Sequence, residues 1–258
     1  MSGPVTLAAD GPLTVLTIAN PPLNLFDANV LDGLSASVQE LASDPPRALL
    51  IRAEGKVVSG GVDVHEFDGL SSEGADGLWK RLIGTVRQVE ALPCPSVFAA
   101  HALCLTAAFE VALGCDLLVA AQSARFGLVE RVVGLTPSMG GTQRIAERAG
   151  PARARELVMT GALYDATELE RWNVVNRVWP DGIFEERSMA LARDLAAGPT
   201  RAHLATREIV RLAARDGVDA ADEATPAISA ALFETADLKG AVTSFLEEGP
   251  GKASFEGR

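Results

Sequence analysis

The chain has 258 residues, of which 48% are hydrophobic and 22% are charged, and its formal net charge at pH 7 is -11. This apolar content is too high for a disordered protein, and the length suffices for one large α/β domain or two small ones. The excess of acidic over basic residues leaves no basic face of the kind that a general nucleic-acid binder needs. A polyanionic small molecule stays a candidate ligand, because backbone N–H groups can bind phosphate.

The first half of the chain alternates strand and helix patterns. Asp10-Gly11 is a turn signal between two strand-like segments, which are therefore predicted to form a hairpin. Asp27 is a suitable N-cap for a helix whose apolar side chains recur at three- and four-residue steps. The predicted elements are strands over 5–9, 13–18 and 48–51, a helix between Asp27 and Pro45, a glycine-containing loop at 59–61 and a helix over 75–91.

The second half begins with the same alternation and then becomes helical. Pro151 suits the first turn of a helix, because its missing N–H has no partner there in any case. The predicted elements are strands over 96–100, 116–121 and 174–179, and helices over 106–113, 142–148, 151–159, 204–214, 226–235 and 238–247. A mixed β/α part is thus expected over residues 1–197, and a helical part over 198–258.

Neither the cysteines nor the histidines show metal-ligand spacing, and no Gly-x-Ser-x-Gly nucleophile elbow is present. The odd number of cysteines, with no secretory signal pattern, predicts reduced thiols in a cytoplasmic protein. Residues 96–115 are apolar and long enough to cross a bilayer, but His101 and Glu110 interrupt them. We therefore predict a buried strand leading into a buried helix, with no membrane association.

Four local features carry candidate chemistry. The loop 56–64 either presents successive N–H groups to an anion or a carbonyl oxygen, or forms a tight turn. Glu110 lies alone in an apolar run, so its carboxyl group is solvated, paired or raised in pKa. Glu130 adjoins Arg131 in a loop, where carboxylates are usually solvated. The segment 137–144 enters a helix whose N-terminus either faces a ligand's negative charge or simply begins the helix.

Together these segments resemble the crotonase superfamily, the enoyl-CoA hydratase/isomerase family. The resemblance covers nearly the whole chain, and Gly140-Gly141-Thr142-Gln143-Arg144 is its most specific part. The matching segments, in the family's order, are 20–24, 58–64, 110–116, 125–130 and 137–144, followed by 245–248 and Phe255. The resemblance implies an α/β fold, a crotonase-like spiral of ββα units in the core (1–197), with a C-terminal helical trimerisation region (198–258). It also implies a homo-oligomer, either a trimer or a dimer of trimers.

The resemblance also implies the chemistry, which is stabilisation of a thioester enolate by two backbone N–H groups. The matching oxyanion-hole donors are Val62 and Ala107, and fixed donors of this kind need no reorganisation during the reaction. Glu110 and Glu130, 20 residues apart, match the family's two catalytic carboxylates. We assign Glu110 to activation of the water that attacks the β-carbon, and Glu130 to delivery of a proton to the α-carbon.

The other expected site residues lie in the same segments, and the first loop is expected to wrap the CoA adenine through backbone groups. The resemblance implies a coenzyme A thioester as substrate, with no covalently bound cofactor and no metal. Local positive charge is expected from Lys56 or Lys252. The expected CoA-binding residues are Lys56, Gly60, Asp63, Val64 and His65, and the expected substrate-pocket residues are Thr106, Ala108, Pro137 and Ser138.

The chain departs from the family's pattern beside the expected thioester. Thr106-Ala107-Ala108 stands where the family usually has three glycines. Alanine keeps its N–H, while its methyl group narrows the space, and Thr106 is the expected cap of the helix that follows. Val62 replaces a usual alanine and adds further bulk. Ser138 and His65 replace a common glycine and a frequent lysine, respectively.

The expected activity is that of an acyl-CoA lyase of fatty acid metabolism, which hydrates trans-2-enoyl-CoA to 3-hydroxyacyl-CoA. Two alternatives stay open at this point. Glu130 alone would serve an enoyl-CoA isomerase or another enolate-type enzyme of the family. The Thr106-Ala107-Ala108 replacement leaves room for a non-catalytic acyl-CoA-binding protein, although such a protein has no chemical reason to keep two costly carboxylates.

Overall fold

A six-stranded sheet forms the centre of the computed structural model, which describes residues 3–258. Its strand order is β1-β2-β3-β4-β6-β9; β1 and β2 form the predicted antiparallel hairpin, and each later pair is parallel. A smaller sheet has the order β5-β7-β8. The strands are β1 (Val5–Asp10), β2 (Leu13–Ile18), β3 (Ala48–Ala53), β4 (Ser96–Ala100), β5 (Cys104–Leu105), β6 (Leu117–Ala121), β7 (Arg125–Gly127), β8 (Tyr164–Asp165) and β9 (Arg177–Trp179).

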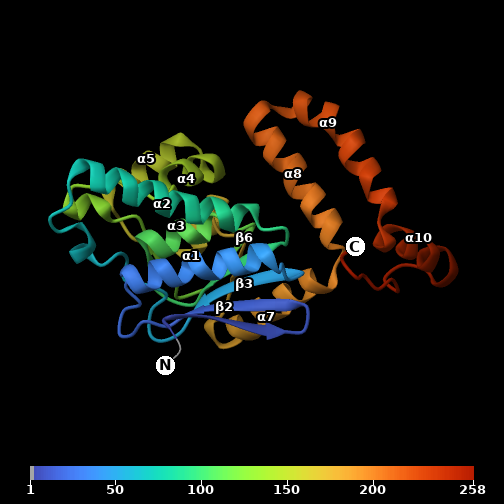
Figure 1. Ribbon diagram of the computed structural model, residues 1–258, viewed down its shortest axis with the longest axis horizontal. Helices are drawn as coiled ribbons and strands as arrows, with labels where there is room; N and C mark the ends of the chain where they lie inside the picture. The colour runs from blue at the N-terminus through green and yellow to red at the C-terminus, as the bar shows by residue number, and fades with distance from the viewer. Residues whose placement is uncertain (1–2) are drawn as a thin grey trace.

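Helices cover both faces of the large sheet (Figure 1), with α1, α2 and α3 on one side and α7 on the other. The helices α8, α9 and α10 extend away from this layered core. The α-helices are α1 (Ala28–Ser43), α2 (Ser72–Ala91), α3 (Thr106–Leu113), α4 (Gly141–Ala149), α5 (Pro151–Thr160), α6 (Ala166–Arg171), α7 (Asp181–Ala197), α8 (Thr200–Asp216), α9 (Val218–Ala231) and α10 (Ala236–Glu248). The short 3-10 helices are η1 (Val64–Phe67), η2 (Glu130–Val133) and η3 (Leu232–Glu234).

The structure confirms the predicted cap of α1 and the burial of its periodic apolar residues. The Asp27 side chain accepts a hydrogen bond from the Val30 N–H and so caps α1, as predicted. The periodic apolar side chains of α1 are at most 3% exposed, and β4 is buried throughout. Burial on this scale removes most of the apolar surface from water, which is the main stabilising contribution to such a fold.

Some predicted boundaries were wrong. The second helix begins at Ser72 rather than residue 75, because the Ser71 hydroxyl accepts from the Gly74 N–H and caps an additional polar turn. Pro226 lies inside α9 instead of at its start, since the helix begins directly after Gly217 with mostly alanine and acidic residues, which show no apolar period. The last strand starts at Arg177 rather than residue 174.

Hydrogen bonds attach the C-terminal segment to the rest of the structure. Arg47 donates hydrogen bonds to the carbonyl oxygens of Phe255 and Gly198, both at 2.7 Å. The Asp237 carboxylate, at the start of α10, accepts from the N–H groups of Glu256 and Gly257. The division at residue 197 stays a prediction, although α7 ends at that position and α8 starts shortly after it.

The three thiols are free and buried. Burial raises the pKa of Cys94 to about 12, and it raises the pKa values of Cys104 and Cys115 further above their usual range. None of the helices in residues 3–258 combines the length and the apolar character that spanning a bilayer requires. The apolar run that begins at Ser96 is divided among β4, β5 and α3, as a strand leading into a helix.

Gly114, at the end of α3, is expected to tolerate no side chain. A Cβ atom there would lie 2.7 Å from Cγ1 of the buried, β-branched Val86, so Gly114→Ala should lower the free energy of unfolding by about 1–3 kcal/mol. The matched control is Gly84→Ala in α2, where a Cβ meets no atom within 4 Å. That control should raise the free energy of unfolding by roughly 0.5–1 kcal/mol. Urea unfolding of both variants is the measurement, and equal midpoints would contradict this packing.

Candidate active site

Three chain segments run parallel and side by side at the centre of the candidate site. Ser59 forms an isolated parallel bridge with Cys104, and the Leu105 N–H donates to the Ser59 carbonyl at 3.1 Å. On the other side, β5 pairs with β7 and places Leu105 opposite Gly127. The carboxyl ends of parallel segments meet at one edge, so the residues that follow them are brought together.

The two expected oxyanion donors lie at equivalent positions beyond that pairing. Val62 is three residues after Ser59, and Ala107 is three residues after its bridge partner Cys104. Ala107 is fully buried in the first turn of α3, where an N–H group has no acceptor within the helix. Val62 is half-buried at the end of the glycine-containing loop.

The expected cap of α3 was wrong. Leu105 occupies the N-cap position, and Thr106 is the first helical residue, with a left-handed φ of 43°. Its hydroxyl accepts a hydrogen bond from the Val62 N–H at 3.2 Å instead of capping the helix. Thr106 thus connects the two loops that carry the expected oxyanion donors.

Glu110 is buried on α3, with only 2% of its surface exposed. Its Oε2 accepts hydrogen bonds from the N–H groups of Met139 (2.9 Å) and Gly141 (2.6 Å), at the start of α4. Burial raises the pKa of Glu110 to about 7; the nearby charge of Glu130 adds to this effect, and the two N–H groups oppose it. Gly141 is required here, because a Cβ would lie 2.9 Å from Cγ of Glu110.

Glu130 begins η2, three residues after β7. Both of its carboxyl oxygens are buried, and they accept no hydrogen bond from the described residues. Burial raises the pKa of Glu130 to about 7. The interpretation of a solvated loop carboxylate was wrong, because both carboxyl oxygens are shielded from solvent; the neighbouring Arg131 guanidinium donates to the Thr160 carbonyl instead. An unpartnered buried carboxyl of this kind marks a candidate functional group.

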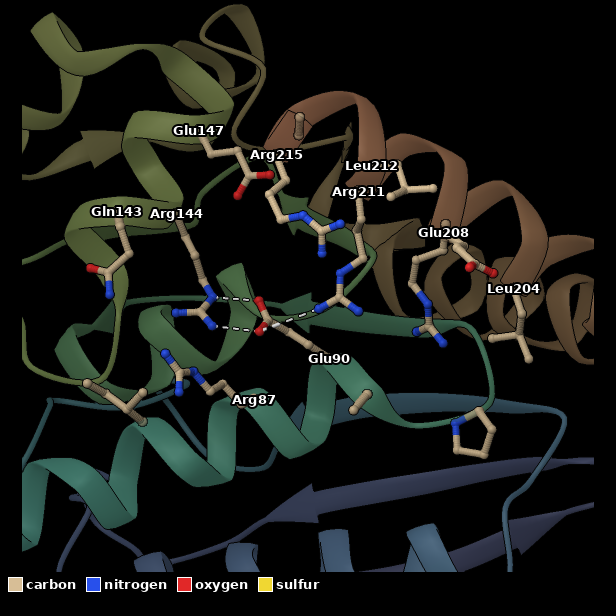
Figure 2. Close-up of a pocket in the computed structure, with 15 residues that line it drawn as sticks. Arg87, Glu90, Gln143, Arg144, Glu147, Leu204, Glu208, Arg211, Leu212 and Arg215 are labelled. Carbon is tan, nitrogen blue, oxygen red and sulfur yellow. Dashed lines mark hydrogen bonds and ion pairs between the residues drawn. The ribbon is translucent and has the colours of Figure 1, made fainter. Parts of the chain in front are cut away.

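A charged pair outside the predicted site holds the loop that binds Glu110. Arg144 and Glu90 form a bidentate ion pair, with both N–O distances at 2.7 Å (Figure 2). Arg144 also donates to the Gly140 carbonyl at 3.1 Å, so it fixes the backbone between Met139 and Gly141. The sequence signal was Arg144 itself, which lies at the end of the most specific matching segment, but its partner on α2 could not be identified from one sequence.

The same pair lines a cavity of about 1080 Å³ between α2, α4 and α8 (Figure 2). Arginines from both sides face it, including Arg87 and Arg211, and the Arg211 guanidinium lies 3.8 Å from the Glu90 carboxylate. None of the predicted catalytic or oxyanion residues line this cavity.

The expected CoA-binding residues lie along the first loop and η1. The Asp63 carboxylate caps η1 and accepts from both the backbone and the ring of His65, which raises the pKa of His65. The Gly60 N–H is already used by the Leu23 carbonyl. Lys56, Val64 and Lys252 are exposed.

In the expected pocket, Ala108 and Pro137 are buried, and the Ser138 hydroxyl donates to the Thr136 carbonyl. Within residues 3–258, no group of three His, Cys, Asp or Glu side chains has the geometry of a metal site.

Comparisons with known proteins give relatives and solved structures similar to this chain. A probable enoyl-CoA hydratase of Bacillus subtilis is 35% identical over 159 residues, which are 61% of this chain and 62% of the relative. A probable enoyl-CoA hydratase of Mycobacterium bovis is 28% identical over 246 residues, or 95% of each chain. The solved structure of an enoyl-CoA hydratase subunit I from Geobacillus kaustophilus has a TM-score of 0.91 at 28% identity, covering 99% of this chain and 98% of that one.

The family model described as enoyl-CoA hydratase/isomerase matches residues 9–258, nearly the whole chain. The α/β architecture with its C-terminal helices matches the crotonase-type structure at high TM-score. The chain therefore belongs to the enoyl-CoA hydratase/isomerase family of the crotonase superfamily.

Proposed function

We propose that the protein hydrates trans-2-enoyl-CoA thioesters to 3-hydroxyacyl-CoA. The observation that carries this proposal is the pair of buried carboxyl groups, Glu110 and Glu130, each with its pKa raised to about 7. At pH 7 such a pair holds about one proton, so one group can act as a base while the other acts as an acid.

The two carboxyl groups are held differently, and this difference supports separate roles. Oε2 of Glu110 is fixed by the N–H groups of Met139 and Gly141, while Oε1 accepts no hydrogen bond from the described residues. We assign Oε1 to taking a proton from water as the water oxygen bonds to the β-carbon. Glu130 then gives its proton to the α-carbon, which completes the addition across the double bond.

The negative charge that develops on the thioester oxygen needs donors in a site from which water is excluded. In this proposal, these donors lie where the loop ending at Val62 meets the first turn of α3 at Ala107. Donors fixed by the fold stabilise the enolate without reorganisation, and removal of one such donor typically costs about 10²- to 10³-fold in kcat.

Double-bond isomerisation is a second candidate, and one observation favours it. The Glu130 carboxyl has no protein partner among the described residues, so this group alone can move a proton between two carbons of a substrate. A non-catalytic acyl-CoA-binding protein is disfavoured, because burial of two carboxyl groups, one of them without a hydrogen-bond partner among the described residues, costs stability without serving binding.

We also propose that the protein assembles as a trimer or a dimer of trimers through its C-terminal helices. Large apolar side chains on this region are exposed, with Phe245 at 59% and Leu246 at 79%. Exposed apolar side chains gathered on one region mark an interaction surface. The other exposed members are Val210, Val218, Phe233 and Val242.

Glutamine variants test the proposed roles. Glu110→Gln and Glu130→Gln should each lower kcat for hydration by about 10²- to 10⁴-fold, because each removes a proton-transfer group. The assay is loss of the conjugated thioester absorbance across enoyl-CoAs of different chain length, with product analysis. If isomerisation survives Glu110→Gln but not Glu130→Gln, the isomerase assignment replaces the hydratase one. If no chain length is turned over, the hydratase proposal is lost.

The stability of Glu110→Gln provides its folding control. Because the folded-state pKa of Glu110 is raised from 4.5 to about 7, the wild type loses stability as pH rises through that interval. Glutamine keeps an oxygen for the Met139 and Gly141 N–H groups and does not ionise. At pH 8 the free energy of unfolding of the variant should therefore exceed that of the wild type by about 1–3 kcal/mol. A free energy of unfolding below that of the wild type would indicate structural damage.

The pH profile of kcat/KM should be bell-shaped, with its maximum near pH 7. On the acid side, activity rises as Glu110 loses its proton; on the alkaline side, it falls as Glu130 loses its proton. The residual activity of Glu110→Gln should lack the acid limb and keep the alkaline one. Initial rates from about pH 5 to about pH 9 check this, and an alkaline limb missing from the wild type would contradict the role of Glu130.

The oligomer proposal predicts a sedimentation mass of three or six copies of the 27.0 kDa chain. Introducing charge with Phe245→Glu and Leu246→Glu together should shift the mass toward the monomer, since buried unpaired charges oppose association. Met159→Glu is the matched control, because Met159 is 70% exposed on α5, outside this region. A wild type that sediments as a monomer would refute the assembly.

A further inference from the structure

Thr106 has a backbone conformation that its residue type disfavours. The non-glycine residues with positive φ among the described residues are Asn24, Asn173 and Thr106. Asparagine tolerates this region, whereas a β-branched residue there is a true outlier whose strain must be offset by its surroundings. Thr106 is also only 7% exposed and lies between the two expected oxyanion donors.

The surroundings of Thr106 are fitted to its hydroxyl group. A Cβ on Gly61 would lie 2.6 Å from Thr106 Oγ1, so the loop admits the hydroxyl because residue 61 has no side chain. Gly61 itself has a φ of 110°, and its N–H is held by the Ser59 hydroxyl at 3.0 Å. These contacts fix the distance from Val62 N to Thr106 Oγ1 at 3.2 Å.

The hydrogen bonding of this hydroxyl is incomplete on its donor side. A threonine hydroxyl has one proton to donate and two lone pairs that accept. One lone pair takes the Val62 N–H, but no acceptor among the described residues takes the Thr106 proton. A buried hydroxyl that accepts from an amide and leaves its own proton free is polarised toward donating to a further acceptor.

We propose that the Thr106 hydroxyl donates directly to the thioester oxygen and relays the Val62 N–H, so that the oxyanion hole consists of Thr106 O–H and Ala107 N–H. This inference rests on the proposed function, since it concerns the same thioester. As the enolate forms, negative charge on the oxygen shortens both hydrogen bonds of the relay, and no covalent bond of Thr106 breaks. Val62 thus acts through Thr106, as a positioning residue.

Three substitutions test the relay. Thr106→Ser keeps the hydroxyl, Thr106→Val keeps the shape without it, and Thr106→Ala removes both the hydroxyl and the group that covers the Val62 N–H. The readouts are kcat for hydration and the red shift in absorbance of a conjugated enoyl-CoA on binding, which reports polarisation of its carbonyl group. The serine variant should keep the red shift and stay within about tenfold of wild-type kcat. The alanine and valine variants should show a smaller red shift, because the Ala107 N–H is the one donor left, and should lose about 10²- to 10³-fold in kcat.

The contrary outcome is specific. If Thr106→Ala keeps the red shift and kcat, the hydroxyl merely fills the hole until substrate displaces it, and the relay is refuted. If the alanine variant does not fold, Thr106→Gly takes its place, since glycine adopts a φ of 43° without strain and also uncovers the Val62 N–H. If the wild type binds enoyl-CoA without hydrating it, the proposed function fails but the red shift still tests the relay. If no enoyl-CoA binds, both proposals fall.

Discussion

Burial of the Glu110 carboxyl within an apolar helix is the constraint around which the site is built. Without compensation, such a group would destabilise the fold, and two N–H groups at the start of α4 provide that compensation. Their positions depend in turn on Gly141, which leaves room for the carboxyl, and on Arg144, which holds the Gly140 carbonyl. The Glu90–Arg144 ion pair then joins this loop to α2, so the proton affinity of Glu110 depends on packing between helices.

Much of the layered core could be predicted from the sequence, because its elements are long and strongly periodic. The hairpin around Gly11, the cap at Asp27 and the buried helix with Glu110 all follow from local rules. The two- and three-residue strands of the small sheet could not be found this way, since a period needs more positions than they contain. Yet those strands are the ones that bring Leu105 and Gly127 together.

The candidate site was predictable in its residues but not in its contacts. Resemblance to a family marked Glu110 and Glu130, and chemistry left the Glu110 carboxyl three alternatives: solvated, paired or raised in pKa. The structure shows it buried, hydrogen-bonded to two N–H groups and raised in pKa. The sequence could not show that Arg131 turns to Thr160 and leaves Glu130 without a partner. Nor could it show that Thr106 turns its hydroxyl to Val62 instead of capping its own helix, because that choice depends on a glycine more than 40 residues away in sequence.

Chemical labelling of the buried thiols can detect local unfolding around α3. Cys104 precedes α3 and Cys115 follows it, and neither thiol is reactive while it is buried and protonated. An alkylating reagent can therefore reach them only when the segment carrying Glu110 separates from its neighbours. The rate at which these two cysteines are labelled would report the free energy of local unfolding at the site, separately from the unfolding of the outlying helices.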